Sequence, residues 1–409
     1  MQDHYDTLET RSADRRAADL SKALPGLIAG AKGLPGYGFT LADVDPGEIT
    51  SVAALARLPV LRKGDMRRIQ HPGEPFGGLA ALPIEGYSHV FQSPGPIYEP
   101  GRIEGDGWRM GRFLHACGIG RGDVVQNCFS YHLTPGGMVM ESGLRAVGAT
   151  ILPAGTGQTA QQVAAARHLG VTAYTGTPDY LKAILDKADE MGLKLSITRA
   201  AVGGGALFPA LRQDYAERGI ACRQSYGTAE LGLIAYESAA MEGMIVDEGV
   251  IVEIVTPGTG DPVAPGEVGE VVVTLLSPDY PLIRFATGDL SAMMEGESPC
   301  GRTNMRIKGW MGRADQTTKI KGMFVRPEQV AALVAKHDEI ARARVIASRE
   351  AGSDVMTVRI EAHGGDAELF GRSVTELLKL KGRIELVAPG SLPNDGKVID
   401  DMRNYEDIT

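Results

Sequence analysis

Helix-like segments and short apolar strands alternate between about residue 107 and residue 275, and this pattern constrains the fold most. The strand segments DVVQNCF, ATILPAG and VTAYTGTP are each followed by a helix-like segment. They are apolar on both faces, which is typical of strands in a parallel sheet that helices cover on both sides. We therefore expect an α/β fold with its functional groups at the carboxyl ends of the strands, where ligands of such sheets bind.

The domain organisation follows from length and from a later change in pattern. A chain of 409 residues is too long for one hydrophobic core. After residue 245 the sequence turns to β-like runs separated by the turn signals TPGTGD and APGE, and RPEQVAALVAKHDEIARARVIASR begins a small α+β unit. We predict a large N-terminal α/β domain with a β-rich subdomain over residues 1–313 and a small C-terminal α+β domain over residues 314–409.

Composition excludes several classes of partner. The formal net charge of −9 argues against nucleic acid or an anionic membrane surface. No apolar stretch approaches the length that spans a bilayer, and the polar N-terminus lacks the apolar run of a secretory signal. The four cysteines are scattered, without a disulfide framework or a paired metal-binding spacing. We therefore expect a cytoplasmic protein.

The segment SYGTAELG at residues 225–232 combines an aromatic, a glycine, a hydroxyl and a carboxylate, and we expect it at a strand-to-helix turn. Tyr226 can stack on a flat ring, and Thr228 can hydrogen-bond a phosphate. Glu230 can hold Mg²⁺, which prefers carboxylate and phosphate oxygen. The alternative is a helix start with a capping hydroxyl and an early acid, which needs no ligand.

Three later segments carry further candidates. Asp289 follows what reads as a Thr-Gly turn in YPLIRFATGDL and can accept hydrogen bonds from ribose hydroxyls, although a plain Gly-Asp turn is the alternative. Arg313 in GRADQTTKIKG offers a planar fork of donors, or belongs to a solvated loop between domains. Lys397 follows an Asp-Gly turn in LPNDGKVIDD, where a lysine that is only solvated is the alternative.

In their order and spacing these segments resemble the phenylacetate–CoA ligase branch of the adenylate-forming enzymes, a superfamily that includes acyl-CoA synthetases, luciferases and nonribosomal adenylation domains. The resemblance covers nearly the whole chain, from LPVLRKGDM to GKVIDD. It implies that ATP and Mg²⁺ activate an aryl or acyl acid as an acyl-adenylate, which coenzyme A then attacks. It also implies a mobile C-terminal domain and, because many relatives are dimers, a possible homodimer.

The resemblance assigns roles to individual residues. Glu230 matches the magnesium ligand, Asp315 the hinge, and Lys397 the lysine that stabilises negative charge between the carboxylate and the α-phosphate. Thr228 lies near the α-phosphate and counts with Glu230 and Lys397 as catalytic. The nucleotide-binding residues that the resemblance implies are Gly204, Gly205, Ala206, Tyr226, Gly227, Thr228, Asp289, Arg313 and Lys319.

The chain departs from the family at the phosphate loop, which in relatives reads like SSGTTGKP and here reads QSPGPIYEP. The altered loop comprises Ser93, Pro94, Gly95, Pro96, Ile97, Tyr98 and Glu99. Its two prolines lack the N–H groups that cradle an anion, and a carboxylate at Glu99 would repel a triphosphate. The alternative is a local rewiring in which other groups hold the phosphate.

This departure keeps rival functions open. The same fold can pass the acyl group to an amine or a carrier protein, or start from a preactivated acid that needs no triphosphate. A degenerate protein that only binds a nucleotide or an acyl-CoA is a third possibility.

The acid pocket is expected in CFSYHLTPGGM, where Tyr131, His132 and Gly136 are the candidate residues. An aromatic wall with a polar tip suits an aromatic acid, while a satisfied buried histidine is the alternative for His132. Some relatives carry zinc at positions that correspond here to Ser238, Ile245, Ser298 and Cys300. Since only Cys300 could bind zinc and a structural site needs four ligands, we expect no zinc.

Overall fold

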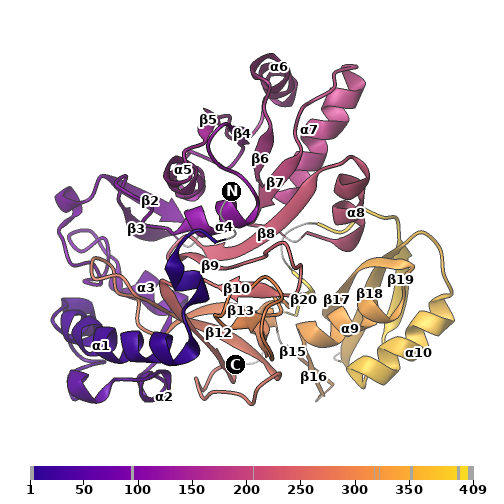
Figure 1. Cartoon of the computed structure of the whole chain (residues 1–409). Helices are drawn as coiled ribbons and strands as arrows, with labels where there is room; N and C mark the ends of the chain where they lie inside the picture. Colours follow the sequence, from indigo (N-terminus) through magenta and orange to yellow (C-terminus); the bar gives the residue numbers. More distant parts are fainter. Residues whose placement is uncertain are drawn as a thin grey trace. The chain divides into compact units, whose positions relative to one another are not determined.

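The computed structural model describes residues 4–93, 96–205, 207–316, 318–321, 323–350, 353–393 and 397–403. It divides into two compact units (Figure 1). The first comprises Met1–Glu267, Val271–Thr287 and Ala292–Gly309, and the second comprises Val268–Glu270, Gly288–Ser291 and Trp310–Thr409. Among the described residues, no helix is long and apolar enough to cross a membrane.

The alternating segment forms a parallel sheet with strand order β5-β4-β6-β7-β8. Its strands are β4 (Val124–Asn127), β5 (Thr150–Pro153), β6 (Ala173–Gly176), β7 (Arg199–Val202) and β8 (Ala221–Thr228). The helices of this region are α4 (Met110–Ala116), α5 (Gly136–Ala146), α6 (Thr159–Leu169), α7 (Pro178–Glu190) and α8 (Pro209–Glu217). The predicted parallel sheet and α/β class are confirmed, and the strand ends point to one edge as expected.

Beyond β8 the sheet continues in the order β9-β10-β14-β13-β12-β11. These strands are β9 (Gly232–Tyr236), β10 (Met244–Val246), β11 (Val250–Val255), β12 (Val268–Leu275), β13 (Phe285–Met294) and β14 (Arg306–Ile307), and β1 (Leu61–Arg62) pairs parallel with β13. The strand-to-helix turn predicted at 225–232 is wrong, because β8 turns back into the antiparallel strand β9. The Thr-Gly turn predicted before Asp289 is also wrong, because these residues lie inside β13.

The N-terminal part packs helices against this sheet. Its helices are η1 (Thr7–Thr10), α1 (Ala13–Lys32), η2 (Pro35–Tyr37), η3 (Pro46–Glu48), α2 (Val52–Leu55), α3 (Lys63–Ile69) and η4 (Ile84–Gly86). Ser12 begins α1 by accepting a hydrogen bond from the Arg15 amide at 3.2 Å. Leu24 and Ile28 of α1 are fully buried and pack with residues of β11 and β12. The hairpin of β2 (His89–Ser93) and β3 (Ile97–Gly101) follows and carries the altered phosphate loop.

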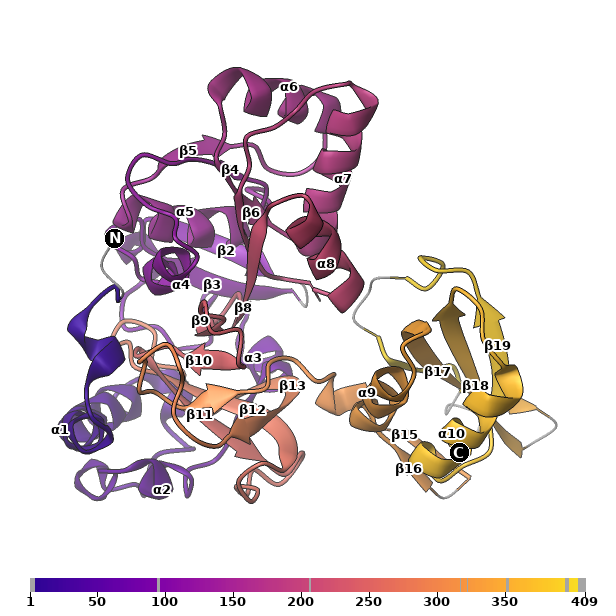
Figure 2. The same cartoon turned by 45° about the vertical axis from the view of Figure 1, so that its right-hand side comes forward.

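The second unit contains a four-stranded sheet with order β19-β18-β17-β20. Its elements are η5 (Ala314–Gln316), β15 (Thr318–Ile320), β16 (Met323–Val325), α9 (Pro327–Lys336), β17 (Ile340–Glu350), β18 (Ser353–Ala362), α10 (Ala367–Leu378), β19 (Arg383–Val387) and β20 (Ile399–Asp401). Alternate residues of β17 and β18, such as Val345 and Val358, share one core with Leu333 of α9 and Phe370 of α10. Both helices therefore cover the same face of this sheet (Figure 2).

Candidate active site

The turn between β8 and β9 carries the SYGTAELG candidates. Tyr226 is 8% exposed, and its hydroxyl donates to Thr287 Oγ1 at 3.1 Å, which in turn donates to the Val271 carbonyl at 3.0 Å. A Cβ on Gly227 would lie 2.4 Å from the Gly232 carbonyl oxygen, so only glycine allows the two strands to approach here. The Tyr226 ring is thus held in a fixed place by Thr287.

Glu230 sits in this turn and is 5% exposed. Thr228 Oγ1 accepts a hydrogen bond from the Leu231 amide at 3.2 Å and so closes the turn. The Lys63 ammonium lies 2.7 Å from Glu230 Oε1, as an ion pair without hydrogen-bond geometry, and within the described residues this oxygen has no hydrogen-bond partner. Lys63 is the first residue of α3, and sequence reasoning gave it no role although it lies in LPVLRKGDM.

The glycine turn after β7 is the predicted adenine surface. Gly204 adopts a left-handed φ of +68°. A Cβ on Gly204 would lie 3.5 Å from the Phe129 ring, and one on Gly205 would lie 3.4 Å from the Pro178 ring. Ala206 falls outside the described residues. The two glycines therefore present bare backbone close to the loops that follow β4 and β6.

The loop after β4 holds the predicted acid-binding residues. The Tyr131 hydroxyl accepts from Asn127 Nδ2 at 2.7 Å and donates to Glu141 Oε2 at 3.0 Å. Burial raises the pKa of Tyr131 above its ordinary value, and the Glu141 charge raises it further. Asn127 is fully buried and also donates to the Gly137 carbonyl at 2.9 Å. Asn127 and Glu141 are therefore supporting residues that the sequence did not single out.

His132 and Gly136 belong to the same loop. The interpretation of His132 as a satisfied buried histidine is wrong, because the residue is exposed; its backbone amide donates to Ser130 Oγ at 3.1 Å. A Cβ on Gly136 would come within 3.5 Å of the Phe129 ring. The loop thus offers an aromatic surface with polar groups at its edge.

In the phosphate-loop hairpin, the Glu99 side chain does not face the solvent as a charged carboxylate. Glu99 is 2% exposed, and its Oε1 accepts from Ser93 Oγ at 2.6 Å. Burial raises the pKa of Glu99 from 4.5 to about 8, and the Glu230 charge adds to this rise. Since the side chain is turned inward and protonated at neutral pH, the expectation that a carboxylate here repels the triphosphate is corrected. Pro94 and Gly95 lie outside the described residues.

Tyr98 and Pro96 lie on the outer side of this hairpin and are exposed. The backbone of Tyr98 is paired in both directions with the side chain of Gln70, at 2.8 Å each. The inward and outward residues alternate along β3, as the two-residue period of a strand requires.

The second unit carries the remaining nucleotide candidates. Asp289 Oδ1 accepts from Trp310 Nε1 at 3.0 Å and lies 3.3 Å from Arg313 Nη1. Lys397 is exposed, and its ammonium donates to Asp400 Oδ1 at 3.0 Å. Asp315 lies in η5 and Lys319 in β15, with side chains outside the described part. Asp289 and Arg313 are thus brought together, and Trp310 is a partner that the sequence did not suggest.

Several known proteins are similar to this chain. Residues 111–275 match the family model of the AMP-binding enzymes. The chain is 29% identical to the phenylacetate-coenzyme A ligase of Thermus thermophilus over 374 residues, which cover 87% of this chain and 83% of that relative. It is 26% identical to the phenylacetate-coenzyme A ligase of Escherichia coli, with 98% of each chain covered. The chain is thus similar to phenylacetate-coenzyme A ligases and, over residues 111–275, to the AMP-binding enzymes.

Solved structures show the same fold. A 2-hydroxyisobutyryl-CoA ligase, in the postadenylation state with 2-HIB-AMP, superposes with a TM-score of 0.81 at 24% identity, and 96% of this chain and 91% of that chain are covered. An anthranilate CoA ligase in complex with anthranoyl-AMP superposes with a TM-score of 0.53 at 17% identity, over 76% and 65% of the two chains. These superpositions show that the chain has the fold of adenylate-forming CoA ligases.

Adenylate-forming CoA ligases use ATP, AMP and coenzyme A, and the solved 2-hydroxyisobutyryl-CoA ligase binds 2-HIB-AMP and CoA. The residues of this chain also fit Mg²⁺ at one position. Glu230 offers a buried carboxylate oxygen without a hydrogen bond in the described structure, next to an ammonium that a metal could displace. Mg²⁺ is commonly held by one or two carboxylates together with substrate phosphates. No cluster of three or more metal-binding side chains occurs in the part of the chain that is described, so Glu230 fits such a shared site and not an all-protein cage.

Proposed function

We propose that this protein is an AMP-forming acid–thiol ligase that uses ATP to join an aromatic carboxylic acid to coenzyme A by way of an acyl-adenylate. The observation that carries the proposal is the buried turn in which Tyr226 is fixed by Thr287 and Glu230 is paired with Lys63. The phenylacetate-coenzyme A ligases and the anthranilate CoA ligase support an aromatic acid. So does the loop after β4, where Phe129 and Tyr131 supply flat rings.

In the nucleotide half of the site, Tyr226 stacks on the adenine and the bare backbone of Gly204 and Gly205 lies along it. Asp289 accepts from the ribose hydroxyls, and Arg313 beside it supports the same sugar. When bound through Glu230, Mg²⁺ offsets part of the phosphate charge. These roles match the positions that the family resemblance implies.

Lys63 provides the positive charge that the altered loop has lost. Its side chain is 41% exposed, so the ammonium can move from Glu230 to a phosphate oxygen at little cost. Because Glu99 is buried and protonated at neutral pH, no carboxylate charge opposes a triphosphate at this hairpin. The enzyme thus retains ATP use with a rewired phosphate loop.

In the first half-reaction a carboxylate oxygen of the acid attacks the α-phosphorus of ATP, and pyrophosphate leaves. Lys397 stabilises the negative charge that builds up between the two groups, after releasing Asp400. In the second half-reaction the sulfur of coenzyme A attacks the acyl carbon, the thiol proton passes to solvent, and AMP leaves. A hinge at Asp315 and a domain boundary at residues 313 and 314 belong to this proposal.

The test is ATP–pyrophosphate exchange with a panel of aromatic and short-chain acids, followed by thioester formation with coenzyme A. We expect exchange with one or more aromatic acids and AMP release on adding coenzyme A. A lack of exchange with every acid, together with tight binding of AMP or acyl-CoA, would favour a preactivated substrate or a binding protein. The cytoplasmic location and the homodimer stay predictions, and light scattering in solution tests the second.

A further inference from the structure

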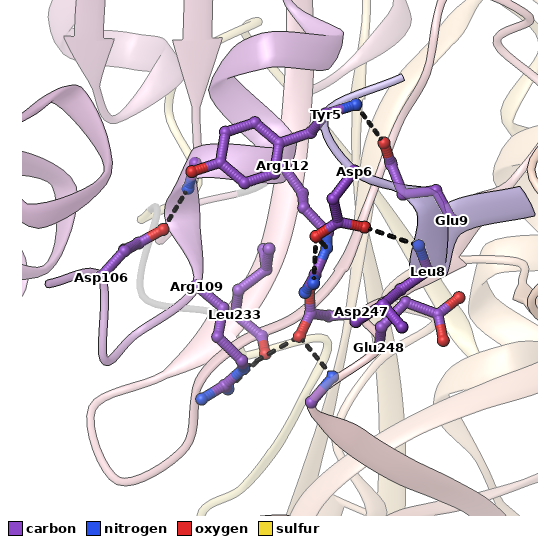
Figure 3. Close-up of polar contacts among 12 residues, drawn as sticks. Tyr5, Asp6, Leu8, Glu9, Asp106, Arg109, Arg112, Leu233, Asp247 and Glu248 are labelled. Atoms are coloured by element: carbon purple, nitrogen blue, oxygen red, sulfur yellow. Dashed lines mark hydrogen bonds and ion pairs between the residues drawn. The ribbon is translucent and has the colours of Figure 1, made fainter. Parts of the chain in front are cut away.

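Arg109 connects the segment that follows Glu230 to a buried network of charges. Figure 3 shows its bonds to Leu233 and Asp247. Its Nη2 donates to the carbonyls of Leu231 at 2.5 Å and of Leu233 at 2.8 Å. The Leu233 amide donates to the Trp108 carbonyl at 3.1 Å in return. The segment before α4 and the turn after Glu230 are therefore joined in both directions.

The rest of the guanidinium is fixed as well. Nε donates to Asp247 Oδ1 at 2.9 Å, and Nη1 donates to the Gly107 carbonyl at 3.1 Å. Asp247 is fully buried and also accepts from Arg112 Nη1 and from the Gly249 amide. The planar fork thus spans a buried carboxylate on one side and the turn on the other, a geometry that a lysine cannot reproduce.

The backbone of Arg109 adopts a strained conformation. Its φ of +65° lies in the left-handed region that side chains other than glycine rarely adopt. Such strain persists where surrounding contacts hold it, and it clusters at functional sites. The same arrangement requires glycine at position 249, because a Cβ on Gly249 would lie 2.3 Å from Arg109 Cδ.

We propose that Arg109 is a positioning residue for the metal-binding step, because it holds the carbonyls of Leu231 and Leu233, one and three residues after Glu230, and so fixes where that carboxylate points. The inference rests on the proposed role of Glu230. It adds that the orientation of the Glu230 carboxylate is set by a residue more than a hundred positions earlier in the chain. Groups that orient a metal ligand typically change metal affinity or activity by about 10- to 100-fold when they are replaced.

Arg112 supplies the matched control. It shares Asp247 with Arg109, and the exposed fractions of the two side chains are 12% and 15%. In the described structure, however, Arg112 pairs with Asp6 and Asp247 and not with the carbonyls of the turn. A purely structural role of the buried network predicts similar losses for Arg109→Lys and Arg112→Lys, whereas positioning predicts a difference.

The experiment measures exchange by the full-length enzyme as a function of Mg²⁺ concentration. We expect Arg109→Lys to raise the Mg²⁺ concentration for half-maximal exchange by about 10- to 100-fold, while the KM for the acid stays unchanged because its pocket lies in the loop after β4. Arg112→Lys should leave both values unchanged. Equal effects of the two variants, or no effect of Arg109→Lys, would overturn the proposal.

Hydrogen exchange gives a second measurement that needs no activity. Peptides that cover residues 229–236 should exchange faster in Arg109→Lys than in the wild type, with little change elsewhere in the first unit. If that variant does not fold, Asp247→Asn tests the same clamp, and unchanged exchange in the turn would refute it. If the wild type fails to catalyse ATP–pyrophosphate exchange, the proposed function fails, yet these peptides still decide the role of Arg109.

Discussion

Glu99→Gln should make the protein more stable above pH 5, by an amount that grows with pH. In the folded protein the pKa of Glu99 is raised to about 8 by burial, whereas its ordinary value is 4.5. Between these values the unfolded chain has lost a proton that the folded protein still holds, so the free energy of unfolding falls as pH rises. Glutamine has the same shape and no proton to lose, so it removes this dependence.

The magnitude follows from the two pKa values. One pKa unit corresponds to about 1.4 kcal/mol, so the rise from 4.5 to about 8 amounts to about 5 kcal/mol. Little of this difference is present near pH 5, and nearly all of it is present at pH 8 and above. For a unit of this size the expected gain of Glu99→Gln in Tm at pH 8.5 is on the order of 10 °C.

The assay is thermal and urea unfolding of the wild type and the variant between pH 5 and pH 9. Ser93→Ala is the control, because it removes the hydrogen bond to Glu99 but keeps the carboxyl group and therefore the pH dependence. ATP–pyrophosphate exchange should also fall above about pH 8 in the wild type, as Glu99 ionises, and less so in Glu99→Gln. Parallel stability curves, or a variant less stable at pH 8.5, would show that Glu99 is ionised in the folded protein.

Three further substitutions test the proposed roles. Lys63→Met should raise the KM for ATP by about tenfold and leave AMP affinity unchanged, and equal weakening of both by calorimetry would mean that Lys63 does not act on the outer phosphates. Tyr131→Phe leaves Glu141 without the hydroxyl that donates to it, so urea unfolding should show a loss of about 1 to 2 kcal/mol. Lys397→Ala should lower exchange by about 100-fold or more and spare thioester formation from supplied acyl-adenylate, whereas equal loss of both half-reactions would mean that its role is misassigned.

The sheet was predictable because strands that are apolar on both faces leave few alternatives to a parallel sheet under helices. The turn that carries Glu230 was not predictable by the same logic. A hydroxyl and an acid after a strand are also the signature of a helix start, and what decides the matter is the pairing of Tyr226 with Ala235 and the close approach at Gly227. Pairing of this kind depends on residues that a local pattern does not contain.

Supporting residues were missed for the same reason. Lys63 reaches Glu230 from a helix more than 160 positions earlier, and Arg109 reaches Leu231 across 122 positions. Contacts between residues this far apart in the chain produce no local spacing that a sequence motif could contain. The candidate catalytic residues could therefore be proposed from the sequence, whereas the residues that contact and position them are apparent only in the fold.

The altered phosphate loop shows both how a sequence pattern can mislead and how a residue distant in the chain can contribute. The loop has two prolines and a glutamate where relatives have glycines and a lysine. This pattern predicts a site that repels phosphate only if every side chain of the loop faces the ligand. In a hairpin every second side chain faces away, and here Ile97 and Glu99 point inward while Tyr98 points outward. The Glu99 carboxyl group that was expected to repel the triphosphate is therefore buried and uncharged at neutral pH. Lys63 lies beside Glu230, where we propose that it supplies a positive charge for the phosphates. If Lys63 acts as proposed, a loop can lose the family pattern while the positive charge that binds phosphate comes from another part of the fold.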